Sequence, residues 1–372
     1  MRVLQFIPSL HKGGAERMFV DLANNLLKNG CTVEILLAYQ SPPQLNQYRL
    51  NPSIPISIVG SRYEFRFLRY GSIISWAIKN RNKLKDFDII HTHLNDGLIL
   101  GLIIKILFCF TPKRLRPRLV FTCHMVGMAV PKLSLFVNSL GIYIFDEFVL
   151  MATNDFWRKR FHSRAGSSVS VISNGIDWNR SERYPQTELE QGKKSNLLRI
   201  GTLTRLEPER NPVKFLDLFS LVKQNMSENN FRFILGGDGS LNEFIHQYAK
   251  SHDLLEVIDF KGLVVDSNNF LRSLDIYISL NVCDQTGVAA LEAIFQGVPV
   301  VGIQIDKSYV GKDTDLVWSS SDLIHVSDRI RQLSMDENLR NKVREKQFKT
   351  AREGFTANVM ASNYLKRYNS PD

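Results

Sequence analysis

Cysteine is scarce in this chain: four occur among 372 residues, and no two of them form a CxxC pair. They are scattered as Cys31, Cys109, Cys123 and Cys283, each in or beside an apolar run. This usage argues against a disulfide framework and is typical of reduced, mostly buried thiols in a cytosolic protein.

Long hydrophobic runs are missing as well. The longest, Gly97 to Phe110, is only about half of what spans a bilayer, and it carries Lys105 in its middle. We expect this run to form a buried helix. The apolar part of the N-terminal MRVLQFIPSL is too short for a signal peptide, so we expect a first strand there and a cytoplasmic protein.

The signatures of a metal site and of a dinucleotide site are incomplete. His91, His93 and His124 each follow a strand-like run near the expected ligand-facing edge, but no HExxH or paired-ligand spacing accompanies them, so no metal is predicted. Isolated histidines are more often structural than catalytic. The glycine pair Gly13 and Gly14 is not the full GxGxxG fingerprint, and no acidic residue clearly ends the second strand. A dinucleotide oxidoreductase is therefore poorly supported.

Negative charge is in deficit in one half of the chain. The net charge is +10, and residues 1–179 hold 22 Lys and Arg against 11 Asp and Glu, while the remainder is near neutral. A basic N-terminal half suits nucleic acid, an anionic membrane face or a phosphate-bearing substrate. Charge alone does not choose among the three.

The composition, with 44% apolar and 23% charged residues, indicates a folded protein, and the length indicates two domains. Short β-branched runs alternate with helical patterns at Val3 to Ile7, Thr32 to Leu37, Ile54 to Val59, Ile89 to Thr92, Leu119 to Thr122, Phe148 to Ala152 and Val169 to Ile172. The alternation resumes at Leu198 to Leu203, Phe231 to Leu235, Val257 to Phe260, Ile276 to Ser279 and Val298 to Gly302. This rhythm predicts two parallel α/β sheets.

The polar stretch between the two series marks an interdomain linker. It has a proline and no periodic apolar positions, so we expect domains at 1–180 and 197–354 with a linker at 181–196. A C-terminal helix at 355–370 is expected to cross back to the first domain. The first helix carries one apolar stripe from Ala15 to Leu27 and is expected to end at Asn29 and Gly30.

Two loops of the second domain carry candidate chemistry. Asp284, Thr286, Gly287 and Val288 lead into a helix whose N-terminal amides favour an anionic or hydroxylated ligand. Glu292 lies in the apolar part of this helix, so its carboxylate needs partners, which are either sugar or ribose hydroxyls or a neighbouring Arg or Lys.

The other loop follows the strand Leu198 to Leu203. Arg205 and Arg210 there suit a diphosphate, or else they pair with Glu207 and Glu209 at the surface. Farther along, Gly237 in a GGDG turn permits close backbone approach, although such a turn is often only a turn.

In this order, the segments resemble glycosyltransferase family 4, the retaining enzymes of GT-B fold. The resemblance covers nearly the whole chain and rests on IPSLHKGGAERMFVDLANNL, DIIHTHL, VFTCH, VISNGID, GTLTRLEPERNP, FILGGDG and CDQTGVAALEAIFQGVPVVG. It implies an α/β fold of two facing Rossmann-like domains with a deep cleft between them. The donor is a nucleotide-diphosphate sugar, and neither cofactor nor metal is implied.

The resemblance also implies roles for single residues. Glu292 takes the second position of the family's E-x7-E signature and binds ribose, and Asp284 takes the first, where Glu is usual. Arg205 matches the phosphate-binding arginine, and Arg210 stands where Lys is usual, which keeps the charge but changes its geometry. Gly13 and Gly14 match a glycine loop near the donor phosphate and the acceptor, and His124 matches a histidine close to the transferred sugar.

The implied reaction is transfer with retention, in which the enzyme positions the substrates and stabilises the departing diphosphate. The acceptor, a saccharide or a polyprenyl-diphosphate-linked saccharide of cell-surface polysaccharide biosynthesis, is expected at the N-terminal domain. Residues expected to contact this acceptor or the inner face of the plasma membrane are Arg62, Arg66, Arg69, Arg114 and Arg116. Aromatic residues alternate with the first three, as in an interfacial segment.

Other interpretations stay open. The basic face is a solvated surface in the simplest case, and nucleic acid is not expected because no recognition module accompanies the charge. Asp284, Gln285 and Arg210 depart from the family pattern, which leaves room for a degenerate member that binds a nucleotide sugar or a partner enzyme without turnover. A nucleotide-sugar epimerase of the same architecture is disfavoured by the ordered segments.

Overall fold

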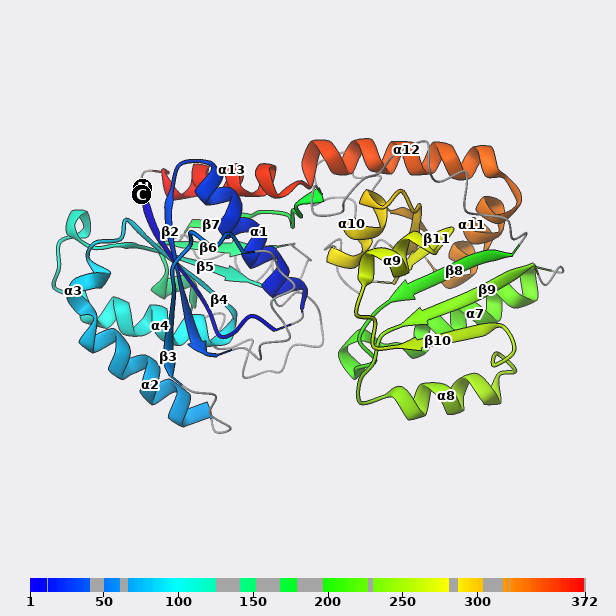
Figure 1. Cartoon of the computed structure of the whole chain (residues 1–372), viewed down its shortest axis with the longest axis horizontal. Coiled ribbons are helices and arrows are strands. Elements are labelled where there is room, and N and C mark those ends of the chain that lie inside the picture. The colour runs from blue at the N-terminus through cyan, green and yellow to red at the C-terminus, as the bar shows by residue number, and fades with distance from the viewer. Residues whose placement is uncertain are drawn as a thin grey trace. The chain divides into compact units, whose positions relative to one another are not determined.

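The computed structural model describes residues 1–11, 13–40, 50–60, 66–124, 141–151, 168–178, 197–226, 230–280, 287–303, 317–320 and 322–370. The chain divides into two compact units: Met1–Gly175 with Ala357–Asp372, and Ile176–Thr356. The expected linker at 181–196 lies outside the described residues. Each unit holds one parallel sheet with helices on both faces (Figure 1).

The first unit is built on a seven-stranded parallel sheet of order β3-β2-β1-β4-β5-β6-β7. Its strands are β1 (Arg2–Ile7), β2 (Thr32–Tyr39), β3 (Ile56–Gly60), β4 (Ile89–His93), β5 (Arg118–Cys123), β6 (Glu147–Leu150) and β7 (Ser168–Val171). The central strands are buried on both faces, which explains their almost continuous apolar runs.

Helices cover both faces of this sheet. On one face, α1 (Gly14–Lys28) and α13 (Ala357–Tyr368) lie side by side and share a core with the inward side chains of β1 and β2 (Figure 1). On the other face, α2 (Arg66–Lys79), α3 (Arg81–Leu84) and α4 (Leu94–Leu107) bury a second core. Helix α1 has the predicted stripe and is followed by Gly30 at φ +83°, which ends it as expected.

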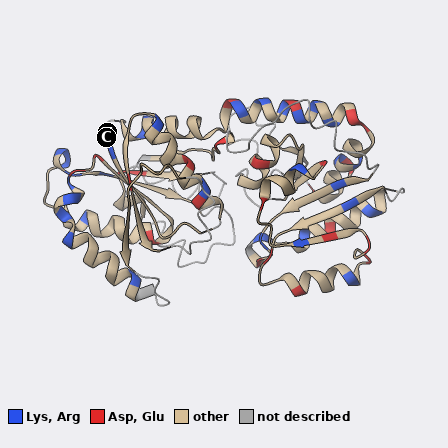
Figure 2. Ribbon diagram, viewed as in Figure 1, with Lys and Arg blue, Asp and Glu red and all other residues tan. Residues whose placement is uncertain are grey.

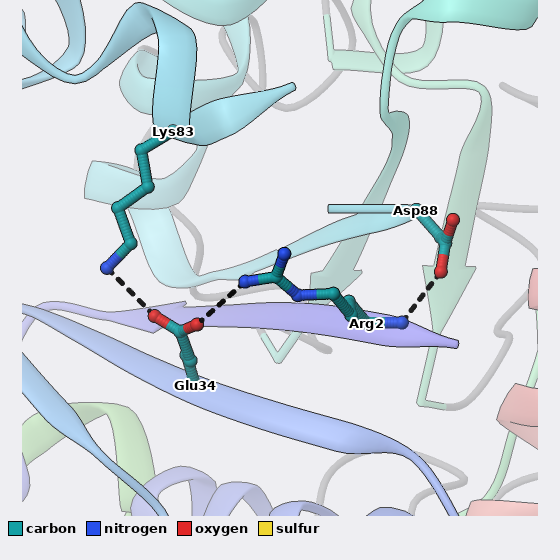
Figure 3. A network of polar contacts seen from close by, with 4 residues as sticks. All are labelled: Arg2, Glu34, Lys83 and Asp88. Atoms are coloured by element: carbon teal, nitrogen blue, oxygen red, sulfur yellow. Dashed lines mark hydrogen bonds and ion pairs between the residues drawn. The ribbon is translucent and has the colours of Figure 1, made fainter. Parts of the chain in front are cut away.

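Charged side chains tie the amino ends of the strands together. Glu34 of β2 accepts from the guanidinium of Arg2 at 3.4 Å and from Lys83 Nζ at 2.9 Å, and the backbone N–H of Arg2 donates to the Asp88 carboxylate at 2.7 Å (Figure 3). Arg2 and Lys83 are 44% exposed, so these pairs contribute little to stability. These pairs lie at the amino ends of the strands. Parallel sheets bind ligands at the opposite edge, where the strands have their carboxyl ends.

The second unit repeats the design with a six-stranded parallel sheet of order β10-β9-β8-β11-β12-β13. Its strands are β8 (Leu198–Leu203), β9 (Phe231–Gly236), β10 (Ile258–Gly262), β11 (Ile276–Ser279), β12 (Val300–Ile303) and β13 (Trp318–Ser320). Its helices are α7 (Val213–Asn225), α8 (Asn242–Ser251), α9 (Ser267–Arg272), α10 (Val288–Phe295), α11 (Leu323–Met335) and α12 (Glu337–Gly354). The short edge strand β13 escaped the sequence analysis.

Helix α12 leads the chain from the second unit to α13 of the first. Acidic and basic residues are spread along α12 (Figure 2), which leaves few apolar positions to hold it. Its buried Gln347 instead pairs with β12, accepting from the backbone N–H of Val300 at 2.8 Å and donating to the same residue's carbonyl at 2.7 Å. The side-chain amide thus substitutes for a neighbouring strand at that point.

One expectation about burial was wrong, and another holds for most of the residues concerned. Helix α4, expected to be buried, exposes 41% of Leu102 and 62% of Ile106. Its apolar residues run around the whole helix, and only one side of it can face the sheet. Of the described cysteines, Cys31 and Cys123 are buried and Cys109 is exposed in the turn after α4, in keeping with mostly buried thiols; Cys283 lies outside the described residues. Within the described residues, no helix is long and apolar enough to cross a membrane.

Candidate active site

Each sheet has one position where the strand order reverses. In the first unit it lies between β1 and β4, and in the second between β8 and β11. The loops that leave neighbouring strands at such a position run to opposite faces of the sheet, so a crevice opens at the carboxyl ends of the strands. Most candidate residues of both units follow these strands, while Gly237 follows β9 and His124 follows β5.

In the second unit, the loop after β8 carries the two candidate arginines. Arg205 and Arg210 are both exposed. Arg210 ends a short 3-10 turn, Pro208–Arg210, and the next residue, Asn211, has φ +44°, a left-handed conformation that Asn tolerates better than most residues. Proline then begins the approach to α7, so Arg210 is held at a sharp corner and not on a regular helix.

Glu207, between the arginines, is engaged with a neighbouring loop. Its carboxylate accepts from the Ser240 hydroxyl at 2.6 Å and from the Ser240 backbone N–H at 3.1 Å. These hydrogen bonds, followed by the charge of Arg205, lower the pKa of Glu207. The carboxylate therefore fastens the β8 loop to the turn after β9 and also interacts with Arg205, so the surface pairing weighed from the sequence is present in part.

The turn after β9 approaches the β8 loop backbone to backbone. The N–H of Thr204 donates to the Gly236 carbonyl, and that of Leu206 donates to the Asp238 carbonyl, both at 3.0 Å. Gly237 has φ +130°, and a Cβ there would collide with the carbonyl oxygen of Thr204. The structure thus gives Gly237 a definite reason to be glycine: both its conformation and its space exclude a side chain.

Tyr277 of β11 escaped the sequence analysis, although a tyrosine in an otherwise aliphatic strand was an available signal. It is 4% exposed, and its hydroxyl donates to the Leu203 carbonyl at 3.2 Å. Burial raises the pKa of this hydroxyl to about 12; hydrogen bonds with Thr202 and Leu203 oppose the shift, Glu292 adds to it, and Arg210 opposes it. The Tyr277 hydroxyl thus interacts electrostatically with both Glu292 and Arg210.

Glu292 lies in α10 and is 4% exposed. A carboxylate at that depth requires polar partners, and it has interactions within the protein. Gly287 is the N-cap of α10 and contributes no side-chain cap, so the first amides of the helix, from Val288 onward, are not covered by its own cap residue. Asp284, Gln285 and Thr286 lie outside the described residues.

In the first unit, the loop after β1 reaches α1 through the glycine pair. Gly13 is the N-cap of α1 in extended backbone, which any residue can adopt, and Gly14 is the first residue of the helix. A Cβ at Gly13 would meet the flexible carboxylate of Glu16. Neither the φ angle nor this contact strictly requires glycine, because the Glu16 side chain can move away from an added Cβ.

The three histidines gather on one face of this sheet. His91 and His93 are fully buried in β4, with ring centroids 4.1 Å apart, and His93 Nδ1 lies 3.0 Å from His124 Nε2 at the end of β5. His124 stays partly exposed. Burial lowers the pKa of His91 and of His93 well below the ordinary value and that of His124 to about 4, so all three rings are neutral at pH 7.

The chain turns abruptly after His93. That residue is both the end of β4 and the N-cap of α4, and the next one, Leu94, has φ +61°. A left-handed leucine costs about 1–2 kcal/mol. The surrounding structure holds this strained turn, which keeps His93 at the carboxyl edge of the sheet; such strain is common at functional sites.

The arginines expected at the acceptor or membrane face differ in their exposure and in their ion pairing. Arg69 is 16% exposed and pairs with Asp96 at 2.7 Å, and Arg116 is 18% exposed and lies 3.6 Å from Asp146. Arg114 is exposed. Arg62 lies outside the described residues, and Arg66 begins α2 without a described side chain. Arg69 and Arg116 are thus engaged inside the unit, and Arg114 faces outward.

Comparison with known proteins gives an independent view of the chain. Residues 12–180 match the family model described as Glycosyltransferase Family 4, and residues 186–350 match that described as Glycosyl transferases group 1. The alpha-1,4-N-acetyl-D-galactosaminyltransferase of Campylobacter jejuni, named for its GalNAc-alpha-(1->4)-GalNAc-alpha-(1->3)-diNAcBac-PP-undecaprenol acceptor, is 24% identical over 359 residues, 92% of this chain and 91% of that protein.

Two further comparisons agree. The UDP-Gal:alpha-D-GlcNAc-diphosphoundecaprenol alpha-1,3-galactosyltransferase of Escherichia coli is 24% identical over 190 residues, 47% of this chain and 49% of that protein. The crystal structure of Anabaena HepE in complex with UDP and glucose covers 100% of both chains, with a TM-score of 0.74 and 17% identity. With two family models matched in order over most of its length, the chain belongs to glycosyltransferase family 4 and has the GT-B fold.

Proposed function

We propose that this glycosyltransferase moves a sugar from a nucleotide-diphosphate sugar to a saccharide carried on polyprenyl diphosphate, with retention of configuration, in cell-surface polysaccharide biosynthesis. The observation that carries the donor part is the grouping at the switch point of the second unit. There β8 leads to the exposed Arg205 and Arg210, and the neighbouring β11 is followed by α10 with the buried Glu292. Tyr277 of β11 joins the two strands by donating to the Leu203 carbonyl at 3.2 Å. The acceptor part is supported by relatives named for undecaprenol-linked substrates.

The chemistry follows from the charges. Cleavage of the sugar–phosphate bond leaves a diphosphate with growing negative charge, which Arg205, Arg210 and the first amides of α10 can stabilise. Glu292 accepts hydrogen bonds from ribose hydroxyls. In the first unit, His124 is neutral at pH 7 because burial lowers its pKa to about 4, so it contacts the transferred sugar as a hydrogen-bonding group and not as a cation. Uridine diphosphate is the proposed carrier, since HepE is known with UDP and glucose.

The test is a donor screen with an undecaprenyl-diphosphate-linked saccharide as acceptor. We expect nucleoside diphosphate to be released only when the acceptor is present, with a product heavier by one sugar residue, and we expect the same rate in excess EDTA. Equal release without acceptor would indicate a hydrolase. Tight donor binding with no release in any combination would favour a binding protein without turnover and overturn the proposal.

We further propose that the protein docks on the anionic inner face of the plasma membrane through the first unit. The surface in question, called here the α2–α4 surface, consists of the exposed apolar residues Ile74, Ile78, Leu102, Ile106, Phe110 and Leu115 and the exposed basic residues Arg81, Lys113 and Arg114. Helices α2 and α4 pack against each other, and the Arg81 guanidinium lies 5.8 Å from the centre of the Phe108 ring, which joins α3 to the end of α4.

This surface combines the two features that an interfacial contact needs. Phe110, in the turn that follows α4, is 100% exposed, and Ile106 in the last turn of the helix is 62% exposed. Lys113 and Arg114 follow directly, so apolar side chains that enter the headgroup region stand beside charges that attract anionic lipid. Of the arginines expected from the sequence at the acceptor or membrane face, this surface includes Arg114. It leaves out Arg69 and Arg116, which are engaged in ion pairs.

A further inference from the structure

A line of buried hydroxyl and imidazole groups runs from the C-terminal helix α13 into the sheet of the first unit. Tyr368 Oη lies 2.6 Å from His91 Nδ1, and His91 Nε2 lies 2.7 Å from Thr122 Oγ1. Thr122 Oγ1 lies 2.9 Å from Tyr364 Oη, which donates to Met151 Sδ at 3.7 Å. Each of these five residues is at most 5% exposed.

The direction of donation along this line follows from its end. A thioether sulfur can only accept, so the Tyr364 proton points to Met151 and the Tyr364 oxygen accepts from Thr122. The Thr122 oxygen then accepts from His91 Nε2–H, and His91 Nδ1 accepts from Tyr368. Burial keeps His91 neutral by lowering its pKa. One set of donors satisfies every group, and it selects the Nε2–H tautomer of His91.

The line continues by ring contact to the candidate active site. The ring of His91 lies against that of His93, with centroids 4.1 Å apart. The ring of His93 also contacts Phe19 of α1 edge-on, with centroids 5.0 Å apart. His93 is thereby held between α1 and His91, and its Nδ1 hydrogen-bonds His124 Nε2 at 3.0 Å. A rotation of His91 would move the ring on which His93 rests, and His93 holds His124.

We propose that Tyr364 and Tyr368 are positioning residues for sugar transfer, which act through His91 and His93 to orient His124. The proposal rests on the proposed function, because it takes His124 to contact the transferred sugar. Arg367 of the same helix lies 3.9 Å from the buried Glu147, which also pairs with Arg118 at 3.6 Å. Helix α13 is held mainly by its packing against α1 and the core of the first unit, which phenylalanine at these positions preserves, so a change at the hydroxyls leaves the helix attached.

The variants that test the proposal are Tyr364→Phe and Tyr368→Phe, each of which removes one oxygen and leaves the packing. The matched control is Tyr248→Phe in the second unit, which loses a hydrogen bond of 2.7 Å to Asp217. The first readout is the ¹⁵N NMR spectrum of histidine-labelled protein without substrate. We expect wild-type His91 to show Nε2 protonated and Nδ1 bare, and we expect Tyr368→Phe to lose this preference.

The second readout is steady-state transfer. We expect kcat to fall by about 10- to 100-fold in both variants while the donor KM changes less than about twofold, since a small misplacement of a catalytic group costs rate more than binding. A merely structural role would lower the melting temperature and leave kcat and the His91 spectrum unchanged, as we expect for Tyr248→Phe. That result, or an Nδ1–H tautomer in wild type, would overturn the proposal.

Failure of the proposed function would look different. In that case the wild-type protein itself transfers no sugar from any donor tested, whatever the variants do. An active wild type with equally active Tyr364→Phe and Tyr368→Phe leaves the function standing and removes only the role of α13.

Discussion

In the proposed donor site, Arg205 and Glu292 serve two different parts of one ligand, the nucleotide-diphosphate sugar. Diphosphate needs positive charge that is accessible, and Arg205 is exposed; ribose hydroxyls need an acceptor shielded from water, and Glu292 is 4% exposed. A buried carboxylate forms stronger hydrogen bonds than an exposed one because water competes less. The two residues should therefore fail in different ways when they are changed.

We expect Arg205→Ala to lower kcat by about 10²- to 10³-fold, the usual cost of removing one group that stabilises a developing anion. Glu292→Gln should instead raise the donor KM by about tenfold or more, because a hydrogen bond to a charged acceptor is worth roughly 1.5–3 kcal/mol. Glu34→Gln serves as control, since Glu34 pairs with Arg2 and Lys83 at the opposite edge of the first sheet (Figure 3). Wild-type kinetics in both site variants would refute the assignment.

Gly237 offers a second test at the scale of one residue. In Gly237→Ala the new methyl group meets the carbonyl oxygen of Thr204 at φ +130°, so we expect the free energy of unfolding to fall by more than about 2 kcal/mol. Gly262→Ala is the matched control: Gly262 also has a positive φ, +56°, but has no atom within 4 Å of the added Cβ.

Urea unfolding of both variants measures the difference. The control should lose only the strain of a left-handed residue, about 1–2 kcal/mol. If the two alanine variants were equally stable, the close contact between the β8 and β9 loops would have no energetic weight.

Among the elements, α4 departs most from what its composition suggests. It packs one side on the sheet and turns Leu102 and Ile106 outward, where together with α2 they form the α2–α4 surface. An apolar surface that stays in water has no stabilising role in the isolated unit. Its position beside Lys113 and Arg114 suits an anionic lipid surface.

We expect Ile106→Asp with Phe110→Asp to lower binding to anionic vesicles at least about tenfold, because each buried apolar side chain contributes roughly 1.5–3 kcal/mol and the added charges repel the lipid. The control pair is Leu263→Asp with Met335→Asp, which changes apolar residues of the second unit that are 67% and 76% exposed. Co-sedimentation at low salt measures the bound fraction. Equal binding by both double variants would exclude the α2–α4 surface as the contact.

At the scale of the whole molecule, the buried histidines couple folding to pH. Burial lowers the pKa of His124 to about 4 and those of His91 and His93 well below 6.5, so the unfolded chain binds more protons than the folded one below pH 6.5. The free energy of unfolding is therefore highest above the unfolded pKa of these histidines, about 6.5, and it falls as the pH decreases below that value. Each histidine adds about 1.4 kcal/mol per pH unit to this slope.

We expect the unfolding free energy to decrease between pH 6.5 and 5, and we expect His124→Gln to reduce that slope by about one proton. Denaturant titrations at several pH values measure it. A slope that His124→Gln does not alter would show that this residue is charged in the folded state.

The sequence alone determined the features that depend on short spacing. The alternation of β-branched runs with striped helices predicted twelve strands that the structure contains in nearly the same places, and Gly30 ended α1 as expected. The motifs that follow β8 and precede α10 were found because residues near in sequence stay near in a strand–loop–helix unit. The expected Asp284 and Thr286 lie outside the described residues and stay predictions.

Only the tertiary structure decided which side chains meet across the sheet. His91 and Tyr368 are 277 residues apart and lie 2.6 Å from each other, while Arg69, one member of an apparently exposed basic series, turns inward to Asp96. No local pattern encodes such partners, because hydrogen bonds and ion pairs depend on which faces the packed helices and strands present to one another. The contacts of Tyr277 and Tyr364 and the exposed side of α4 became visible only in the folded structure.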